Sequence, residues 1–376
     1  MTINEIIAHI NNCIHPDYQE SWDNSGHLVG NADRMCTGVL IALDLTPQVI
    51  EEAIEKGYNL ICTHHPILYS GLKRLTGSTT EQQIIISLIK HDICHYAAHT
   101  SLDNMIDGVS GELARRLGLT SVSVLRPMEG VLRKLITYCP REAAEEIKSA
   151  LWKKAGAGVC QAGLLLAESK QHTYENVSFA SQGEGTFYPN SKTNPHIGEI
   201  EETNSVNETR IEMVYERHNE RRVISTLLQV HPYEEPAFDI IPIKNDSDQI
   251  GGGVVGMLSE PVPIKDFLSL VKEIVNIPVI RTSQLNDTMV QRVALCGGSG
   301  SFLIDDARAK GADIFLTGDL KYHDFQRGDD KLVLADIGHF ESEQFAQSLI
   351  LKAISSKYPD LPMHLTEHQH GFVYYN

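Results

Sequence analysis

The sequence lacks several features that would place it in a class at once. It has no apolar run long enough to cross a membrane as a helix. Its N-terminus, MTINEIIAHINNC, lacks the basic start and apolar centre of a signal peptide. Basic residues are few, with 32 Lys and Arg against 49 Asp and Glu, which gives a formal net charge of -17. Because nucleic acids and anionic membranes require a basic face, we expect neither as a partner.

The cysteines also lack a pattern. There are seven, at positions 13, 36, 62, 94, 139, 160 and 296, and none forms a Cys-x-x-Cys pair. An odd, scattered set is typical of reduced thiols, so we expect a cytoplasmic protein. At 376 residues, 42% of them apolar, the chain has the size of two or three domains. Histidine is abundant, with 17 residues against 13 Tyr and 10 Phe, so the placement of the histidines is the main question.

The first 125 residues alternate between buried strands and helices. Apolar runs predict strands at residues 38–45, 58–63 and 92–98. The segment TPQVIEEAIEKG between the first two has helical spacing, with Thr46 as N-cap, Pro47 in the first turn and Gly57 as the stop. A further helix is expected around residues 80–90. Strands joined by helices predict a parallel sheet covered by helices.

Residues 126–245 follow a different order. The pattern is strand, helix, strand, strand, helix, strand, which is the ferredoxin-like α+β arrangement. The first type of pattern resumes after Gly251-Gly252-Gly253, which we interpret as a linker. We therefore predict an α/β domain split into residues 1–125 and 246–376, with residues 126–245 as an inserted domain.

The two flanking segments resemble each other. A shift of 254 residues places Val39 on Val293 and residues 59–63 (NLICT) on residues 313–317 (DIFLT). A shift of 240 places His99 and Asp103 on His339 and Glu343. Because the order of the elements agrees as well, we predict an internal duplication that gives a three-layer α/β core.

Four polar clusters follow predicted strands at their carboxyl ends, where open α/β sheets bind ligands. They are Thr63–Pro66, His99–Asp103, Thr317–Asp324 and Gly338–Glu343. Imidazole and carboxylate together suit zinc, iron, manganese or a related ion. The four clusters together offer at least five imidazole and carboxylate ligands. Five ligands are too many for one catalytic ion, so they favour a two-metal site.

Each cluster also has a simpler interpretation. A His-His pair is commonly a polar loop, and His339 and Glu343 at i and i+4 are also a plausible surface pair. His91 and His95 are expected to be structural. The Gly297–Gly300 turn is either an anion cradle or a tight turn between strand and helix. His231, Glu234 and Glu235 form either a ligand site or a rigid turn, and the neighbouring prolines favour the turn.

Together the motifs resemble the Nif-three-like family, whose members are often named type-two homologues of GTP cyclohydrolase I. The resemblance rests on Trp22–Gly26 and on the clusters that contain His64, His99, Asp319 and His339. HPYEEPAFDI and GEGTFYPNSKTNPHIG in the insertion resemble the PII-like or CutA-like domain of some bacterial members. Ser25 and His27 depart from the family pattern, in which both positions are usually apolar.

This resemblance implies a homohexamer, a ring-shaped trimer of dimers, with a dinuclear metal site facing an internal cavity. It assigns two divalent ions per chain to five ligands, which are His64, His65, Asp103, His339 and Glu343. It also implies that the motif containing Trp22, Asp23 and Asn24 helps to build the core near the site.

The expected function is hydrolysis of a small nucleotide-like or phosphorylated substrate by a metal-bridging hydroxide. Glu343 would bridge the ions and His99 or His323 would act as general acid or base. Lys321 or the Gly297–Gly300 turn would hold an anionic group of the substrate. The alternative is a non-catalytic hexameric metal-binding scaffold or regulator with an insert that senses a small molecule.

Overall fold

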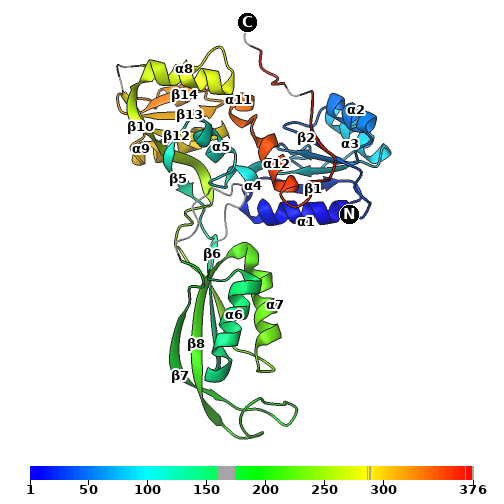
Figure 1. Cartoon of the computed structure of the whole chain (residues 1–376), viewed down its shortest axis with the longest axis vertical. Coiled ribbons are helices and arrows are strands. Elements are labelled where there is room, and N and C mark those ends of the chain that lie inside the picture. The colour runs from blue at the N-terminus through cyan, green and yellow to red at the C-terminus, as the bar shows by residue number, and fades with distance from the viewer. Residues whose placement is uncertain (159–173, 286, 288, 369, 375–376) are drawn as a thin grey trace. The chain divides into compact units, whose positions relative to one another are not determined.

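The computed structural model describes residues 1–158, 174–285, 287, 289–368 and 370–374 (Figure 1). The chain forms two compact units. Among the described residues, the first unit contains residues 1–127 and those from 248 onward, and the second contains residues 128–158 and 174–247. The domain boundaries predicted from the sequence were 125/126 and 245/246. The six described cysteines are free thiols, and Cys160 lies outside the described residues.

The first unit contains a five-stranded sheet whose centre is the predicted parallel sheet. Its strands, in sheet order, are β1 (Gly26–Val29), β4 (Cys94–Ala97), β3 (Leu60–Thr63), β2 (Val39–Ala42) and β15 (Met363–Leu365). Strands β4, β3, β2 and β15 are parallel, and β1 is an antiparallel edge. The parallel sheet predicted from three apolar runs is therefore confirmed.

Local sequence explains the helix α2 (Pro47–Lys56) that joins β2 to β3. The Thr46 hydroxyl accepts a hydrogen bond from the Val49 N–H, and Pro47 occupies the first turn. Gly57 ends the helix in the left-handed conformation, with φ of 69°. The predicted caps are confirmed at both ends. The next helix, α3 (Thr80–Lys90), also lies where the sequence placed it.

A second sheet of the same unit has six strands. In sheet order they are β11 (Arg281–Thr282), β14 (Val333–Asp336), β13 (Ile314–Gly318), β12 (Met289–Ser299), β10 (Gly251–Pro263) and β5 (Thr120–Pro127). Strand β5 belongs to the first chain segment but pairs with β10 of the last segment. Strand β15 makes the reverse exchange, because it pairs with β2. These exchanges join both segments into one unit.

The two sheets share a register. Val39 of β2 pairs with Leu60 of β3, and Val293 of β12 pairs with Ile314 of β13. Both residues of the second pair lie 254 positions after those of the first, as the sequence shift requires. Each sheet also has an antiparallel edge strand next to the last parallel strand, β1 beside β4 and β11 beside β14.

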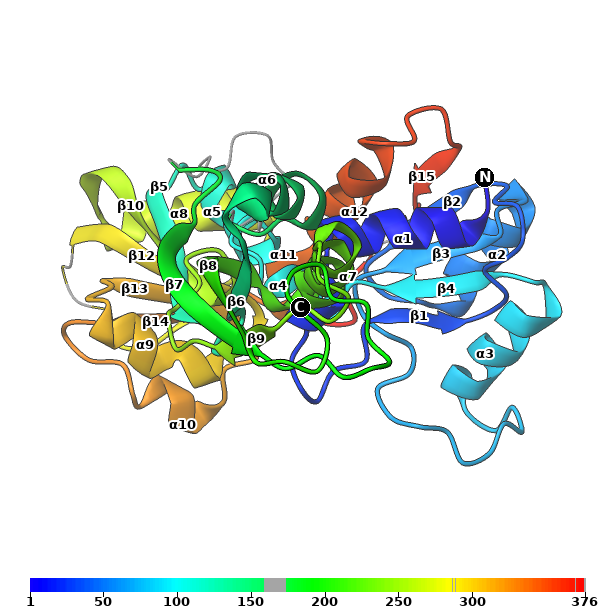
Figure 2. The same ribbon diagram turned by 90° about the horizontal axis from the view of Figure 1, so that it is seen from below.

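Helices cover both faces of the second sheet. Val293 and Leu295 of β12 pack with α5 (Val109–Arg116) and α8 (Ile264–Val275). The intervening Ala294 and Cys296 pack with α9 (Ile304–Ala309) on the other face. On the first sheet, Figure 2 shows α1 (Ile3–Cys13) and α3 on opposite sides. The remaining helices of the first unit are α4 (His99–Asp103), α10 (Tyr322–Phe325), α11 (His339–Glu343) and α12 (Ala346–Ser355).

The predicted glycine linker is wrong. Gly251, Gly252 and Gly253 begin β10, and Gly251 and Gly252 pair with β5. A Cβ on Gly251 would lie 2.1 Å from the carbonyl oxygen of Arg126. The run of glycines therefore permits close approach of two strands, which is the other common reason for glycine in a sheet.

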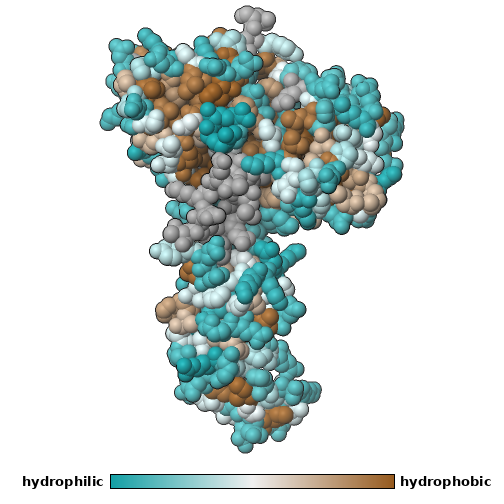
Figure 3. All heavy atoms as spheres, in the orientation of Figure 1, coloured by the Kyte–Doolittle hydropathy of each residue, from teal (hydrophilic) through white to brown (hydrophobic). Residues whose placement is uncertain are grey.

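The second unit is a four-stranded antiparallel sheet with two helices. Along the chain its elements are β6 (Leu132–Pro140), α6 (Ala144–Ala155), β7 (Phe179–Phe187), β8 (Asn204–Glu216), α7 (Glu220–Val230) and β9 (Phe238–Pro242). The sheet order is β7-β8-β6-β9, and both helices contribute to a separate core cluster. Figure 3 shows hydrophobic residues scattered singly on a mainly hydrophilic face of this unit. Among the described residues of the whole chain, no helix is long and apolar enough to span a membrane.

Candidate metal centre

The structure brings the five predicted ligands together in the first unit. His64 and His65 follow directly after β3. Helices α4 and α11 have five residues each, and each begins with histidine and ends with a carboxylate, Asp103 and Glu343 respectively. Because residues four apart lie on one face of a helix, His339 and Glu343 point the same way.

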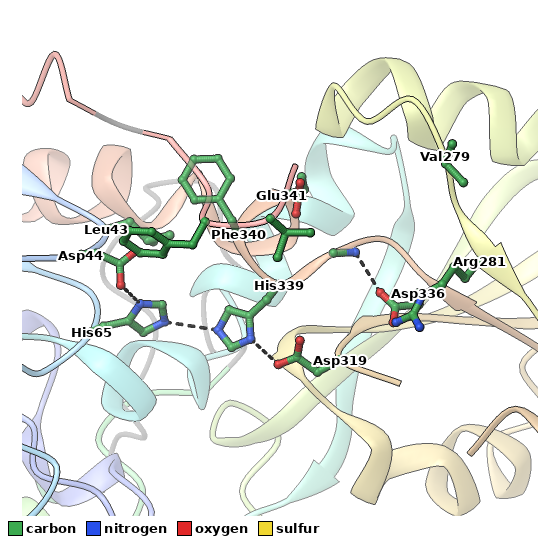
Figure 4. A pocket seen from close by; sticks show the side chains of 13 residues that line it. Leu43, Asp44, His65, Val279, Arg281, Asp319, Asp336, His339, Phe340 and Glu341 are labelled. Atoms are coloured by element: carbon green, nitrogen blue, oxygen red, sulfur yellow. Dashed lines mark hydrogen bonds and ion pairs between the residues drawn. The ribbon is translucent and has the colours of Figure 1, made fainter. Parts of the chain in front are cut away.

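Glu343 lies at the centre of this cluster, with its two oxygens facing different histidines. Its Oε2 is 3.0 Å from Nε2 of His65 and 3.0 Å from Nε2 of His339. Its Oε1 faces Nε2 of His64 at 3.8 Å. The Nε2 atoms of His65 and His339 are 3.4 Å apart, and Figure 4 shows the two rings facing each other. The ligand atoms of His64, His65 and Glu343 all lie within 4.8 Å of one another.

Buried polar atoms without partners test whether a metal fits. Both ring nitrogens of His64 and Oδ1 of Asp103 are buried and have no hydrogen-bond partner among the described residues. Each such atom costs about 1–3 kcal/mol of stability unless it is satisfied. Nε2 of His64 lies 3.4 Å from Asp103 Oδ1, and two ligands of one tetrahedral zinc ion lie about 3.4 Å apart. The donor set therefore fits a first-row ion.

Two carboxylates hold the far side of the histidine rings. Asp44 Oδ1 accepts a hydrogen bond from Nδ1 of His65 at 2.8 Å, and Asp319 Oδ2 accepts one from Nδ1 of His339 at 2.7 Å. Such bonds direct the opposite nitrogen, Nε2, toward a metal. Asp319 lies in a predicted cluster, but sequence reasoning missed Asp44. Its position directly after a buried strand was the available signal.

The pKa values of the clustered side chains follow from these contacts. Burial opposes protonation of both histidines, but Asp44 and Glu343 raise the pKa of His65 to about 10. Glu343 and Asp319 raise the pKa of His339 to about 9. Burial lowers the pKa of His64 to about 4. Despite its own burial, Glu343 has a pKa well below its usual range because the three histidines surround it. Because the pKa values of His65 and His339 are raised, metal binding to these two residues would release protons.

His99 lies beside the predicted ligands. Its ring centroid is 5.5 Å from those of both His64 and His65. Asp23 accepts a hydrogen bond from His99 Nδ1 at 2.8 Å, and the Tyr69 hydroxyl lies 3.5 Å from Nε2. Burial opposes ionisation of Asp23, yet hydrogen bonds from His99 and Thr100 hold its pKa well below the usual range. Asp23 therefore fixes the orientation of His99.

The other residues of the Trp22–Asn24 motif have separate positions. The ring of Trp22 lies 5.9 Å from that of His99, but the residue is 61% exposed, so this member of the motif lies outside the core. Asn24 donates a hydrogen bond to the carbonyl of Leu68. His95 is buried beside the Thr63 hydroxyl, as its structural interpretation requires.

The structure separates several further candidates from the cluster. His323 lies in α10, where its contacts are with Gln326 and the ring of Tyr322. Lys321 is exposed at the start of α10. Neither is among the residues that contact the predicted ligands in the described part of the chain. His231 lies in the second unit, where both ring nitrogens bond to backbone atoms, in agreement with the rigid turn.

The glycine turn after β12 is a tight turn and not an anion cradle. The N–H groups of its glycines donate to hydroxyl groups within the protein: Gly297 to Ser110, Gly298 to Ser342 and Gly300 to Thr317. These donors are therefore not available to a phosphate. Gly298 instead makes room for Glu343, since a Cβ there would lie 2.1 Å from Oε1.

A cavity of about 660 Å³ opens beside the cluster (Figure 4). His65 and His339 form part of its wall, together with Phe340 and Arg281. Arg281 bonds to Asp336 and to the Leu320 carbonyl, and its side chain remains 60% exposed. This volume is typical of sites for small molecules.

A two-sheet α/β unit with a buried histidine–carboxylate cluster that fits metal defines the class of protein. The model of the Duf34/NIF3 (NGG1p interacting factor 3) family matches residues 1–370, and the chain belongs to that family.

Two relatives and one solved structure, all from bacteria, are similar to this chain. The chain is 39% identical, over 305 residues, to the "GTP cyclohydrolase 1 type 2 homolog" of Staphylococcus aureus Mu50, covering 81% of this chain and 80% of that protein. It is 37% identical, over 307 residues, to the Bacillus subtilis protein of the same name, covering 81% and 79%. The crystal structure of a Bacillus cereus protein related to NIF3 is similar over 100% of this chain and 99% of that one, with 32% identity and a TM-score of 0.83.

Proposed function

We propose that the chain binds two divalent ions and hydrolyses a small nucleotide-like or phosphorylated compound. The observation that carries this proposal is the position of Glu343 between two groups of donors. One oxygen faces His64, which lies beside Asp103, and the other faces His65 and His339. Each group would hold one ion, and Glu343 would contribute an oxygen to each group.

Two such ions supply activated water and stabilise negative charge on oxygen during hydrolysis. The protein's own residues supply orientation and proton transfer. Asp23 holds Nδ1 of His99, so that Nε2 remains to hold or release a proton near the cluster. His323 remains a second candidate for this role. Its contacts are with Gln326 and Tyr322 and not with the predicted ligands, which favours His99.

The cavity supports a substrate with an anionic group. Apart from His65 and His339, Arg281 is the basic residue in its described lining, which also contains Asp44, Asp319, Asp336 and Glu341. Because these carboxylates repel an anion, we infer that bound cations are required before a nucleotide or phosphoester enters. The name of the relatives makes GTP the first compound to examine.

The test compares metal-loaded wild-type protein with His64→Ala in turnover of GTP and simple phosphoesters. We expect turnover by the wild type and its loss in the variant, because His64 is a buried donor with no other partner. Metal analysis of both proteins accompanies the assay. Two tightly held ions per chain without turnover of any compound would refute hydrolysis, and equal turnover by the variant would refute the site.

The second candidate is a metal-binding scaffold or regulator without catalysis. The β-α-β-β-α-β order and the β7-β8-β6-β9 sheet of the second unit favour it, because we interpret this unit as an inserted ferredoxin-like domain of the PII or CutA type. The matching registers of the two sheets likewise support duplication of the metal-binding core. Free cysteines favour the cytoplasm as its location.

We also propose the ring-shaped homohexamer, a trimer of dimers, that the family resemblance implies. Light scattering of the full chain is expected to give six times the mass of 41.8 kDa. A monomer in metal-loaded preparations would remove the hexamer from the proposal and leave the metal site unaffected.

A further inference from the structure

The second unit has a cavity that no function above uses. Its volume is about 350 Å³, within the range of small-molecule sites. Aromatic rings from three parts of the unit form much of its lining. Tyr138 comes from β6, Phe187 ends β7, and Tyr233 lies in the turn between α7 and β9. Tyr188 follows β7 and adds a fourth ring.

Apart from His196, the ionisable side chains of the lining other than tyrosine are all carboxylates. Glu208, Glu234 and Glu235 supply three carboxylates, and the described lining contains no Lys or Arg. Aromatic faces carry partial negative charge and attract cations. Carboxylates and rings together therefore favour a positively charged ligand and disfavour an anionic one such as a nucleotide.

Hydrogen bonds hold the central groups of this lining in place. The Tyr233 hydroxyl donates to Oε1 of Glu208 at 2.8 Å. The Tyr233 N–H donates to Nδ1 of the buried His231, whose Nε2 bonds to the Tyr138 carbonyl at 3.0 Å. A Cβ on Gly185 would lie 2.1 Å from Oε2 of Glu208, so the glycine leaves space for that carboxylate. The carboxylate position is thus fixed by the fold and does not depend on a flexible surface side chain.

We propose that this cavity binds a small organic ammonium compound. Its positive nitrogen would lie near Glu208, and its alkyl groups would contact the rings of Tyr138, Phe187 and Tyr233. A single metal ion does not fill a cavity of this volume, whereas an ammonium compound with several carbons does. This site lies in the second unit and is independent of the metal centre.

The test is calorimetric titration of the full chain with choline and with 3,3-dimethylbutan-1-ol, its neutral isostere. Choline is expected to bind at least about tenfold more tightly, because only the cation gains the ring and carboxylate interactions. Spermidine in a parallel titration distinguishes primary and secondary amines from quaternary ones. Equal binding of the neutral isostere would overturn the proposal, as would binding of ATP without binding of any amine, or no binding at all.

Variants locate the site. Glu208→Gln keeps an acceptor for the Tyr233 hydroxyl and removes the charge, so ammonium affinity should fall about tenfold. Tyr233→Leu removes a ring and should also weaken binding. Glu146→Gln, at an exposed position of α6 outside the cavity, is the matched control and should bind as the wild type does. Circular dichroism checks that each variant is folded. Unchanged affinity in both folded cavity variants would refute this location.

Discussion

Replacing Glu343 by Gln is expected to remove most bound metal from the protein. The carboxylate is 4% exposed, and its two oxygens face His64 on one side and His65 and His339 on the other. Gln has nearly the same shape but no negative charge, and its amide nitrogen offers no lone pair to a cation. We expect the metal content, measured by plasma mass spectrometry, to fall from two ions to fewer than one per chain. Any hydrolysis should fall by about 100-fold or more.

The control for this variant is Glu341→Gln. Glu341 lies on the same helix and lines the cavity, but it is not among the described residues that contact the three imidazoles. Its variant should therefore retain two ions. If Glu343→Gln keeps two tightly held ions, Glu343 is not a ligand and the proposed sharing of its carboxylate is wrong. Equal metal loss in both variants would indicate a general effect of charge.

Gly298→Ala is expected to displace Glu343 and so to weaken metal binding at the same site. Gly298 has φ of 61°, and the added Cβ would lie 2.1 Å from Oε1 of Glu343. Left-handed backbone costs about 1 kcal/mol with alanine, and forced overpacking adds about 1–3 kcal/mol. We expect the free energy of unfolding, measured with urea, to fall by about 3 kcal/mol. Because relief of the clash moves Glu343, metal content should fall as well.

Gly57→Ala separates backbone strain from the clash. Gly57 has a similar φ of 69°, but nothing lies within 4 Å of the added Cβ. This variant should lose only about 1 kcal/mol and should bind metal as the wild type does. If Gly298→Ala matches it in both stability and metal content, the close packing of Gly298 on Glu343 does not matter to the site.

Much of the fold was readable from the sequence because the signals are local. Continuous apolar runs identified β2, β3 and β4, and the capping residues Thr46 and Gly57 identified α2. The shift of 254 residues also anticipated the common register of the two sheets. The linker was misassigned at Gly251 because glycine serves equally in loops and in closely packed strands. Only the neighbouring backbone of β5 distinguishes these uses.

The sequence by itself determined which side chains were available to the metal centre. Histidines and carboxylates after strand ends, and the i, i+4 spacing in α4 and α11, depend on helix and strand periods alone. The tertiary structure decided which of them meet. The exchange of β5 and β15 between the sheets joins distant chain segments, and the approach of His65 to Glu343 and His339 depends on packing across those segments. Such contacts are set by distances in the folded core, and no local periodicity contains that information.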